Sequence, residues 1–249
     1  MGLFSRNDQR AIIAEFLATM FFVFLGTAAV VAAVDTVGGL DGAALVCIAI
    51  AHGLAILIAV AWTANISGGH INPAVTLSMI VAQRIRPVLG VAYIVAQFAG
   101  AVVGSLLLKW AIPSQFAVGL GRHSLNGSIT RNEAFLLEVV ATTFLLVVIY
   151  NTAISKKGWG INAPIAIGLS IMLIHFALVP WDGASVNPAR SFGPAIVTND
   201  WSAGYAKDFI QVYVLGPAVG GIIAALGWMA WKNFGDDSLE PDLVESEEA

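Results

Sequence analysis

Six long apolar runs dominate the pattern of hydrophobic and polar positions along the chain. They lie at roughly 11–34, 43–63, 88–110, 134–153, 162–180 and 208–231. A helix needs about 20 apolar residues to cross the hydrocarbon core of a bilayer, and the runs are close to that length. The pattern therefore predicts an all-α membrane protein with six transmembrane helices.

Two shorter apolar stretches remain, near 72–82 and 187–197, and neither is long enough to span a bilayer. Each begins with the same tripeptide: Asn72-Pro73-Ala74 in the first and Asn187-Pro188-Ala189 in the second. Proline is tolerated in the first turn of a helix, because the N–H that it lacks would have no partner there. We therefore expect each tripeptide to begin a re-entrant half-helix that dips into the membrane.

The two halves of the chain resemble each other. Residues 11–19 resemble residues 134–142, with Glu15 and Glu138 at matching positions. Three spans per half is an odd number, so the second half must sit upside down, as an inverted 3+3 repeat. The half-helices then enter from opposite faces and meet near the midplane, where broken helices are tolerated only if buried or lining a wet cavity.

This repeat divides the chain into a short N-terminal segment, 1–10, a channel domain, 11–231, and an acidic tail, 232–249. Repeat 1 covers about 11–110 and repeat 2 about 134–231. Seven of the sixteen acidic residues lie in the tail, which we expect to be solvated. Seven of the twelve basic residues fall on the side of both termini, which favours a cytoplasmic location for both ends.

Composition supports a membrane protein and excludes several classes of function. Hydrophobic residues make up 58 % of the chain and charged residues 11 %, against roughly 25 % charged in soluble domains. With a net charge of −4, we expect lipid but no nucleic acid as a partner. The single cysteine, Cys47, excludes an internal disulfide and a cysteine metal cluster, and we expect it to be a small core residue. We expect no cofactor.

At this point the sequence resembles a known family. The run 67–76, Ser-Gly-Gly-His-Ile-Asn-Pro-Ala-Val-Thr, and the run 187–194, Asn-Pro-Ala-Arg-Ser-Phe-Gly-Pro, are similar to the aquaporins, or major intrinsic proteins. The similarity covers nearly all of residues 10–231. It implies the aquaporin fold, a homotetramer with one pore per subunit, and passive, proton-excluding conduction of water in single file, driven by osmotic gradients.

Two asparagines would carry the proton barrier. Asn72 and Asn187 would cap the half-helices at their positive ends. Each amide offers two N–H donors, so the pair can hold one water oxygen in mid-pore and orient that water so that it passes no proton along the file. The two dipole ends also raise the energy of any cation there.

The resemblance implies a narrow outer selectivity filter. It contains Arg190, and the family's spacing from the two asparagines adds His52, His175 and Ala184. Common water channels carry an aromatic residue at the first of these positions, so His52 is a departure that resembles the tonoplast subfamily of plants and favours a wider aperture. His123, between spans three and four, resembles a loop histidine that extends the filter in some tonoplast channels. Three imidazoles would favour ammonia as a co-substrate.

The resemblance also implies supporting groups. Glu15 and Glu138 would accept hydrogen bonds from the half-helix loops, although intramembrane acids can also relay protons. His70 would brace its loop. A ladder of backbone carbonyls would offer acceptors to single-file water, from Gly68, Gly69, His70, Gly183, Ala184 and Ser185.

Other functions remain open at this stage. An ion- or proton-coupled transporter would need titratable groups at the midplane, where the sequence places amides. An intramembrane hydrolase would pair Ser185 with His52 or His175, but no acid or elbow motif accompanies the serine. A structural junction protein would keep the pore shut. Among channels, a broader neutral-solute channel would pass ammonia, hydrogen peroxide or small polyols such as glycerol.

Overall fold

The computed structural model describes residues 3–35 and 38–234. Within this part of the chain, six helices are long and apolar enough to cross a membrane. They cover Arg6–Val34, Gly42–Ser67, Pro87–Ala111, Arg131–Ile154, Gly160–Asp182 and Ala203–Trp231. The six predicted spans are confirmed, and each extends a few residues beyond its most apolar stretch. The predicted acidic tail lies outside the described residues from position 235 onward.

Several spans combine α-helix with a π-helical or 3-10 turn. The elements are α1 (Arg6–Val30) with a π-helical end (Val31–Asp35), α2 (Gly42–Ser67), α4 (Pro87–Ala111), a 3-10 turn (Ser114–Phe116), α5 (Arg131–Ile149) with a π-helical end (Tyr150–Ile154), a 3-10 turn (Gly160–Asn162), α6 (Ala163–Asp182), α8 (Ala203–Asp208), a π-helical segment (Phe209–Leu215) and α9 (Gly216–Phe234). The last three form one span.

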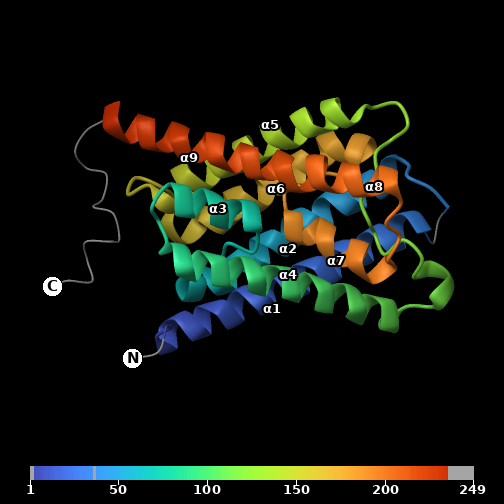
Figure 1. Cartoon of the computed structure of the whole chain (residues 1–249), viewed down its shortest axis with the longest axis horizontal. Coiled ribbons are helices and arrows are strands. Elements are labelled where there is room, and N and C mark those ends of the chain that lie inside the picture. Colours follow the sequence, from blue (N-terminus) through green and yellow to red (C-terminus); the bar gives the residue numbers. More distant parts are fainter. Residues whose placement is uncertain (1–2, 36–37, 235–249) are drawn as a thin grey trace.

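Two short helices, α3 (Pro73–Val81) and α7 (Pro188–Thr198), are the predicted half-helices. Each starts with proline behind an asparagine cap. The Asn72 side chain accepts a hydrogen bond from the Ala74 amide at 2.8 Å, and the Asn187 side chain accepts one from the Ala189 amide at 3.0 Å. Figure 1 shows α3 and α7 approaching the middle of the bundle from opposite ends.

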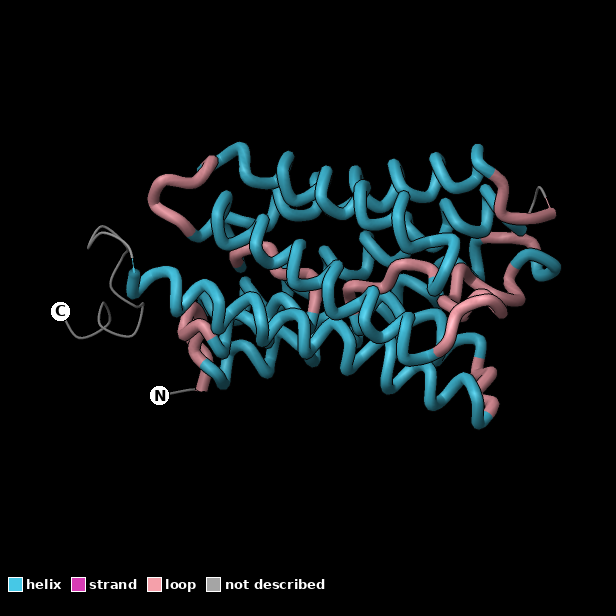
Figure 2. The backbone as a smooth tube through the Cα atoms, turned by 90° about the horizontal axis from the view of Figure 1, so that it is seen from above, coloured by secondary structure: helices cyan, strands magenta, loops and turns pink. Residues whose placement is uncertain are grey.

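The packing of the helices follows the inverted repeat. α1 packs against α4 in the first half, and α5 packs against α9 in the second. Each half-helix packs on the last span of the opposite half, α3 on α9 and α7 on α4, while α2 and α6 pack together across the two halves. Figures 1 and 2 show the resulting bundle, with the start of α1 and the end of α9 at the same end.

Matching glycines allow the outer pairs of helices to touch backbone to backbone. A Cβ added at Gly100 on α4 would collide with the Phe16 carbonyl oxygen on α1. A Cβ added at Gly220 on α9 would collide with the Val139 carbonyl oxygen on α5. Close approach of this kind replaces the hydrophobic effect as the driving force between helices in lipid, because lipid tails are as apolar as the side chains.

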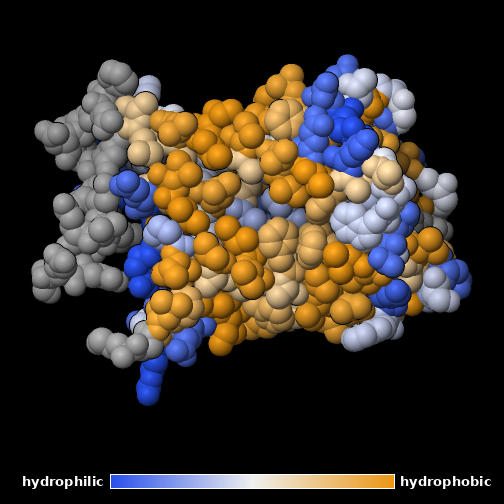
Figure 3. Space-filling model, in the orientation of Figure 1, coloured by the Kyte–Doolittle hydropathy of each residue, from blue (hydrophilic) through white to orange (hydrophobic). Residues whose placement is uncertain are grey.

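Apolar residues cover the middle of the face seen in Figure 3, and polar residues gather at both ends of that face. Cys47 is exposed, so the expectation of a core position is wrong. The helix α2 turns Ala44, Ile48 and His52 inward, and Cys47 falls outside this stripe. A uniformly apolar run predicts insertion into the membrane, but it does not show which side faces lipid.

We expect Gly100→Ala to destabilise the protein, because the added methyl group meets backbone that cannot move aside. Overpacking of this kind typically costs about 1–3 kcal/mol. The matched control is Gly227→Ala on α9, where an added Cβ meets nothing within 4 Å. Thermal unfolding in detergent should show a lower midpoint for the first variant only, and equal midpoints would contradict the close contact.

Candidate functional site

Crossed hydrogen bonds join the two half-helix loops at the centre of the bundle. The Asn72 Nδ2 donates to the Val186 carbonyl at 2.6 Å, and the Asn187 Nδ2 donates to the Ile71 carbonyl at 3.0 Å. Both asparagines line the central cavity. Each amide nitrogen carries two hydrogens, and the described bonds use one of them. The second hydrogen on each side remains for an acceptor in the cavity.

The carbonyls that accept these bonds belong to residues in an unfavourable backbone conformation. Ile71 has φ of 57° and Val186 has φ of 43°. This left-handed region is costly for β-branched residues. Glu15 and Glu138, which were predicted to support the loops, accept hydrogen bonds from the backbone amides of these two residues. Ile71 N donates to Glu15 at 2.6 Å, and Val186 N donates to Glu138 at 2.7 Å, both beyond the reach of solvent.

The structure brings His52, His175 and Arg190 together. Each histidine Nδ1 lies within 2.9 Å of a carbonyl one turn earlier in its own helix. A carbonyl only accepts, so Nδ1 carries the hydrogen and Nε2 is the acceptor. Arg190 Nη2 donates to His52 Nε2 at 3.2 Å, and the two imidazoles stack with centroids 4.3 Å apart.

The loop histidine reaches the same region. His123 Nδ1 lies 2.8 Å from the Ser191 hydroxyl, and its ring contacts Gly183 in the loop before the second tripeptide. Burial lowers the pKa of His123 well below its usual range, and the positive charge of Arg190 lowers it further. The ring is therefore neutral. Among the described residues, His123 Nε2 and His175 Nε2 are buried with no hydrogen-bond partner.

An outer clamp holds the His123 loop in place. Arg122 forms an ion pair with Asp200 at 2.8 Å, donates to the Asp200 carbonyl at 2.7 Å, and stacks 4.2 Å above the Tyr205 ring. Arg190 Nη1 donates to the Gly121 carbonyl at 2.6 Å. No local sequence pattern predicts this clamp, because Arg122 and Asp200 lie 78 positions apart along the chain.

The remaining predicted positions divide between the cavity and its wall. Ala184 is fully buried with φ of 61°, and its amide donates to Asp182 at 2.8 Å. His70 Nδ1 lies 3.1 Å from the Thr76 hydroxyl, as a brace across its loop. Four of the six predicted ladder residues line the cavity: Gly68, Gly69, His70 and Ser185.

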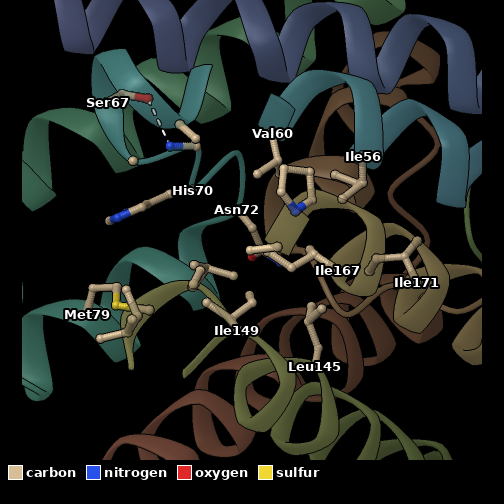
Figure 4. Close-up of a pocket in the computed structure, with 18 of the residues that line it drawn as sticks. Ile56, Val60, Ser67, His70, Asn72, Met79, Leu145, Ile149, Ile167 and Ile171 are labelled. Carbon is tan, nitrogen blue, oxygen red and sulfur yellow. Dashed lines mark hydrogen bonds between the residues drawn. The ribbon is translucent and has the colours of Figure 1, made fainter. Parts of the chain in front are cut away.

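The central cavity has a volume of about 670 Å³ and extends from Arg84 to His175. Of the four predicted filter residues, all of them described, His175 alone lines it. Figure 4 shows mainly aliphatic side chains around Asn72: Ile56, Val60, Leu145, Ile149, Ile167 and Ile171. Sequence reasoning did not single out these residues or the lining role of Arg84, because aliphatic residues are common at every face of an apolar helix.

The chain is similar to known proteins over most of its length. A profile of the family described as Major intrinsic protein matches residues 3–228. Aquaporin TIP2-1 from Zea mays is 43 % identical over 227 residues, covering 90 % of this chain and 87 % of the relative. Aquaporin TIP2-3 from Arabidopsis thaliana is 41 % identical over 227 residues, which again cover 90 % of this chain and 87 % of the relative. The aquaglyceroporin structure from Plasmodium falciparum has a TM-score of 0.74 at 25 % identity, covering 91 % of this chain and 96 % of that one.

We expect acid to destabilise the fold through His123. Its folded pKa is lowered, so the unfolded chain binds more protons, and stability falls once the pH drops below about 6.5, the ordinary histidine value. His123→Asn keeps a donor toward Ser191 but cannot titrate. The unfolding midpoint in detergent should fall less on mild acidification in this variant than in the wild type. An equal fall in both proteins would show that His123 is not held neutral.

Proposed function

The chain belongs to the major intrinsic protein family, and we propose that it is a passive water channel that conducts in single file and excludes protons. The observation that carries this proposal is the pair of asparagines at the meeting point of α3 and α7. Both side chains line one cavity, and within the described part of the chain each uses one of its two N–H groups in a hydrogen bond and keeps the other free.

Those two free N–H groups fit a single water oxygen. An oxygen that accepts from both amides has its own hydrogens directed away, toward the two ends of the file, and has no lone pair left for an incoming proton. The positive ends of α3 and α7 add an electrostatic barrier to hydronium and other cations. The aliphatic walls of the cavity bind passing water weakly, which favours rapid flow.

The groups of the proposed selectivity filter suit small neutral molecules. Arg190 donates hydrogen bonds and repels cations, and it is held by His52 and the Gly121 carbonyl. His175 Nε2 has no hydrogen-bond partner among the described residues, so it can accept a hydrogen bond from a permeating molecule. Water can accept from the arginine and donate to the histidine in the same position.

Ammonia is the second candidate substrate. The observation that favours it is the presence of two buried and unpartnered imidazole nitrogens, on His123 and His175. Ammonia, like water, both donates and accepts hydrogen bonds, so it can meet the arginine and these imidazoles in turn. Glycerol would meet imidazoles at this filter, which offer no apolar wall to its carbon backbone.

The geometry disfavours the enzyme and transporter alternatives. The Ser185 hydroxyl bonds to the Ser191 hydroxyl at 2.6 Å, whereas His52 Nε2 accepts from Arg190, and His175 Nε2 has no hydrogen-bond partner among the described residues. A hydrolase would need one of them on the serine. Members of the family are channels, and Glu15 and Glu138 are engaged by loop amides, so they are poorly suited to carry protons.

We also propose cytoplasmic termini and a homotetrameric assembly. The first follows from the distribution of basic residues, with α1 beginning and α9 ending at one end of the bundle. The second rests on the family resemblance. The protein is in any case an integral, multi-pass membrane protein.

Stopped-flow light scattering of proteoliposomes tests the proposed function. Under an osmotic gradient, vesicles that contain the protein should shrink faster than protein-free vesicles of the same lipid. Shrinkage at the protein-free rate would refute the channel.

We expect His52→Phe to reduce ammonia permeability relative to water. The phenyl ring is larger, and it cannot accept the hydrogen bond from Arg190. Loss of one hydrogen bond worth roughly 1 kcal/mol corresponds to about a fivefold change. Ammonia and water permeabilities should be measured on the same vesicles, and an unchanged ratio would contradict the role of His52.

A further inference from the structure

The two half-helix loops differ at one buried position. When they are aligned on Asn72 and Asn187, the residue five positions earlier is Ser67 in the first repeat and Asp182 in the second. Each is the last residue of its helix, Ser67 of α2 and Asp182 of α6. An acid therefore stands where the other repeat carries a hydroxyl, and Asp182 is fully buried.

In the first repeat, the supporting glutamate has a full set of donors. Glu15 Oε1 accepts from the Ser67 hydroxyl at 2.6 Å and the His70 amide at 2.9 Å. Its Oε2 accepts from the Ile71 amide at 2.6 Å and the Gln97 side chain at 2.8 Å. Four hydrogen bonds compensate for burial of the carboxylate charge.

In the second repeat, two of these four donors have been replaced. Glu138 accepts from the Ser185 amide at 2.6 Å and the Val186 amide at 2.7 Å. Aligned on Tyr93 and Tyr213, the counterpart of Gln97 is Pro217, which has no side-chain donor. The counterpart of Ser67 is Asp182, which can donate only if it is protonated.

The surroundings of Asp182 favour a proton on it. Its Oδ1 accepts from the Ala184 amide at 2.8 Å, and its Oδ2 has no partner in the described part of the chain. Asp182 and Glu138 accept hydrogen bonds from the adjacent amides of Ala184 and Ser185, so the two carboxyl groups share one buried site, where two ionised carboxylates repel each other. One shared proton converts that repulsion into a donor and an acceptor.

The other polar groups around Asp182 leave this assignment intact. The Tyr213 hydroxyl donates to the Asp182 backbone carbonyl at 2.9 Å, not to its carboxyl group. The neutral ring of His123 contacts the adjacent Gly183, and Arg190 on α7 acts on Glu138. The positive charge of Arg190 therefore faces the pair of Asp182 and Glu138. The two charges balance when the pair carries a single negative charge.

We propose that Asp182 is a positioning residue that keeps its proton at neutral pH and donates it in a hydrogen bond to Glu138, as the Ser67 hydroxyl does to Glu15. The pair then fixes the loop through the amides of Ala184 and Val186. The shared proton also removes one of the two negative charges that would otherwise weaken the repulsion of cations by Arg190. The shared proton does not depend on the proposed channel function, whereas the effect on selectivity rests on it.

Infrared difference spectroscopy of the full chain in lipid tests the proton directly. The infrared spectrum of the wild type minus that of the Asp182→Asn variant, both at neutral pH, should contain the C=O stretching band of a protonated carboxylic acid. This band should shift in D2O. Ser67→Ala changes the equivalent position of the first repeat and is the matched control. The spectrum of this variant should still contain the acid band. If the difference contained carboxylate bands instead, Asp182 would be ionised and the proposal would be wrong.

Permeability measurements test the positioning role. Asp182→Ser restores the hydroxyl donor of the first repeat and should conduct water like the wild type, whereas Asp182→Ala should show a severalfold loss. Raising the pH should remove the acid band and lower wild-type permeability, with no change in Asp182→Asn. Equal conduction by the alanine and serine variants would overturn the positioning role. If the wild type showed the acid band but conducted no water, the protonation of Asp182 would stand and the proposed channel function would be refuted.

Discussion

The two hydrogen bonds that cross between the half-helix loops are the interaction on which the rest of the structure depends. They join Asn72 to the Val186 carbonyl and Asn187 to the Ile71 carbonyl. Each loop thereby holds the asparagine of the other in place, so both amides lie in one cavity with a donor to spare. Without this mutual hold, two broken helices would leave unsatisfied backbone groups deep in the membrane.

These hydrogen bonds require a left-handed backbone conformation at Ile71 and Val186, which β-branched residues rarely adopt without support from their surroundings. Ile71 and Val186 present their carbonyls to the asparagines only with positive φ, and the buried glutamates stabilise that conformation by accepting their amide hydrogens. The intramembrane acids are therefore part of the scaffold. The same logic accounts for the crossed packing, in which each half-helix lies on the last span of the other repeat.

Much of the fold followed from the sequence, because membrane insertion and helix capping are local. The six spans and both half-helices could be predicted from apolar run lengths and from proline behind asparagine. Which side of each helix faces the interior of the bundle was less predictable. Cys47 is exposed, against expectation, because the sequence of a uniformly apolar helix does not mark an inner side. The ion pair between Arg122 and Asp200, and the contact of His123 with Ser191, join distant loops and left no local pattern.

The central claim is that one geometry admits water and stops protons. Water and proton flux measured together on the same proteoliposomes test it most directly, with light scattering for volume and an entrapped pH dye for protons. We predict osmotic shrinkage well above that of protein-free vesicles, with proton leakage equal to theirs. Proton leakage that rises with protein content in step with water flow would contradict the account.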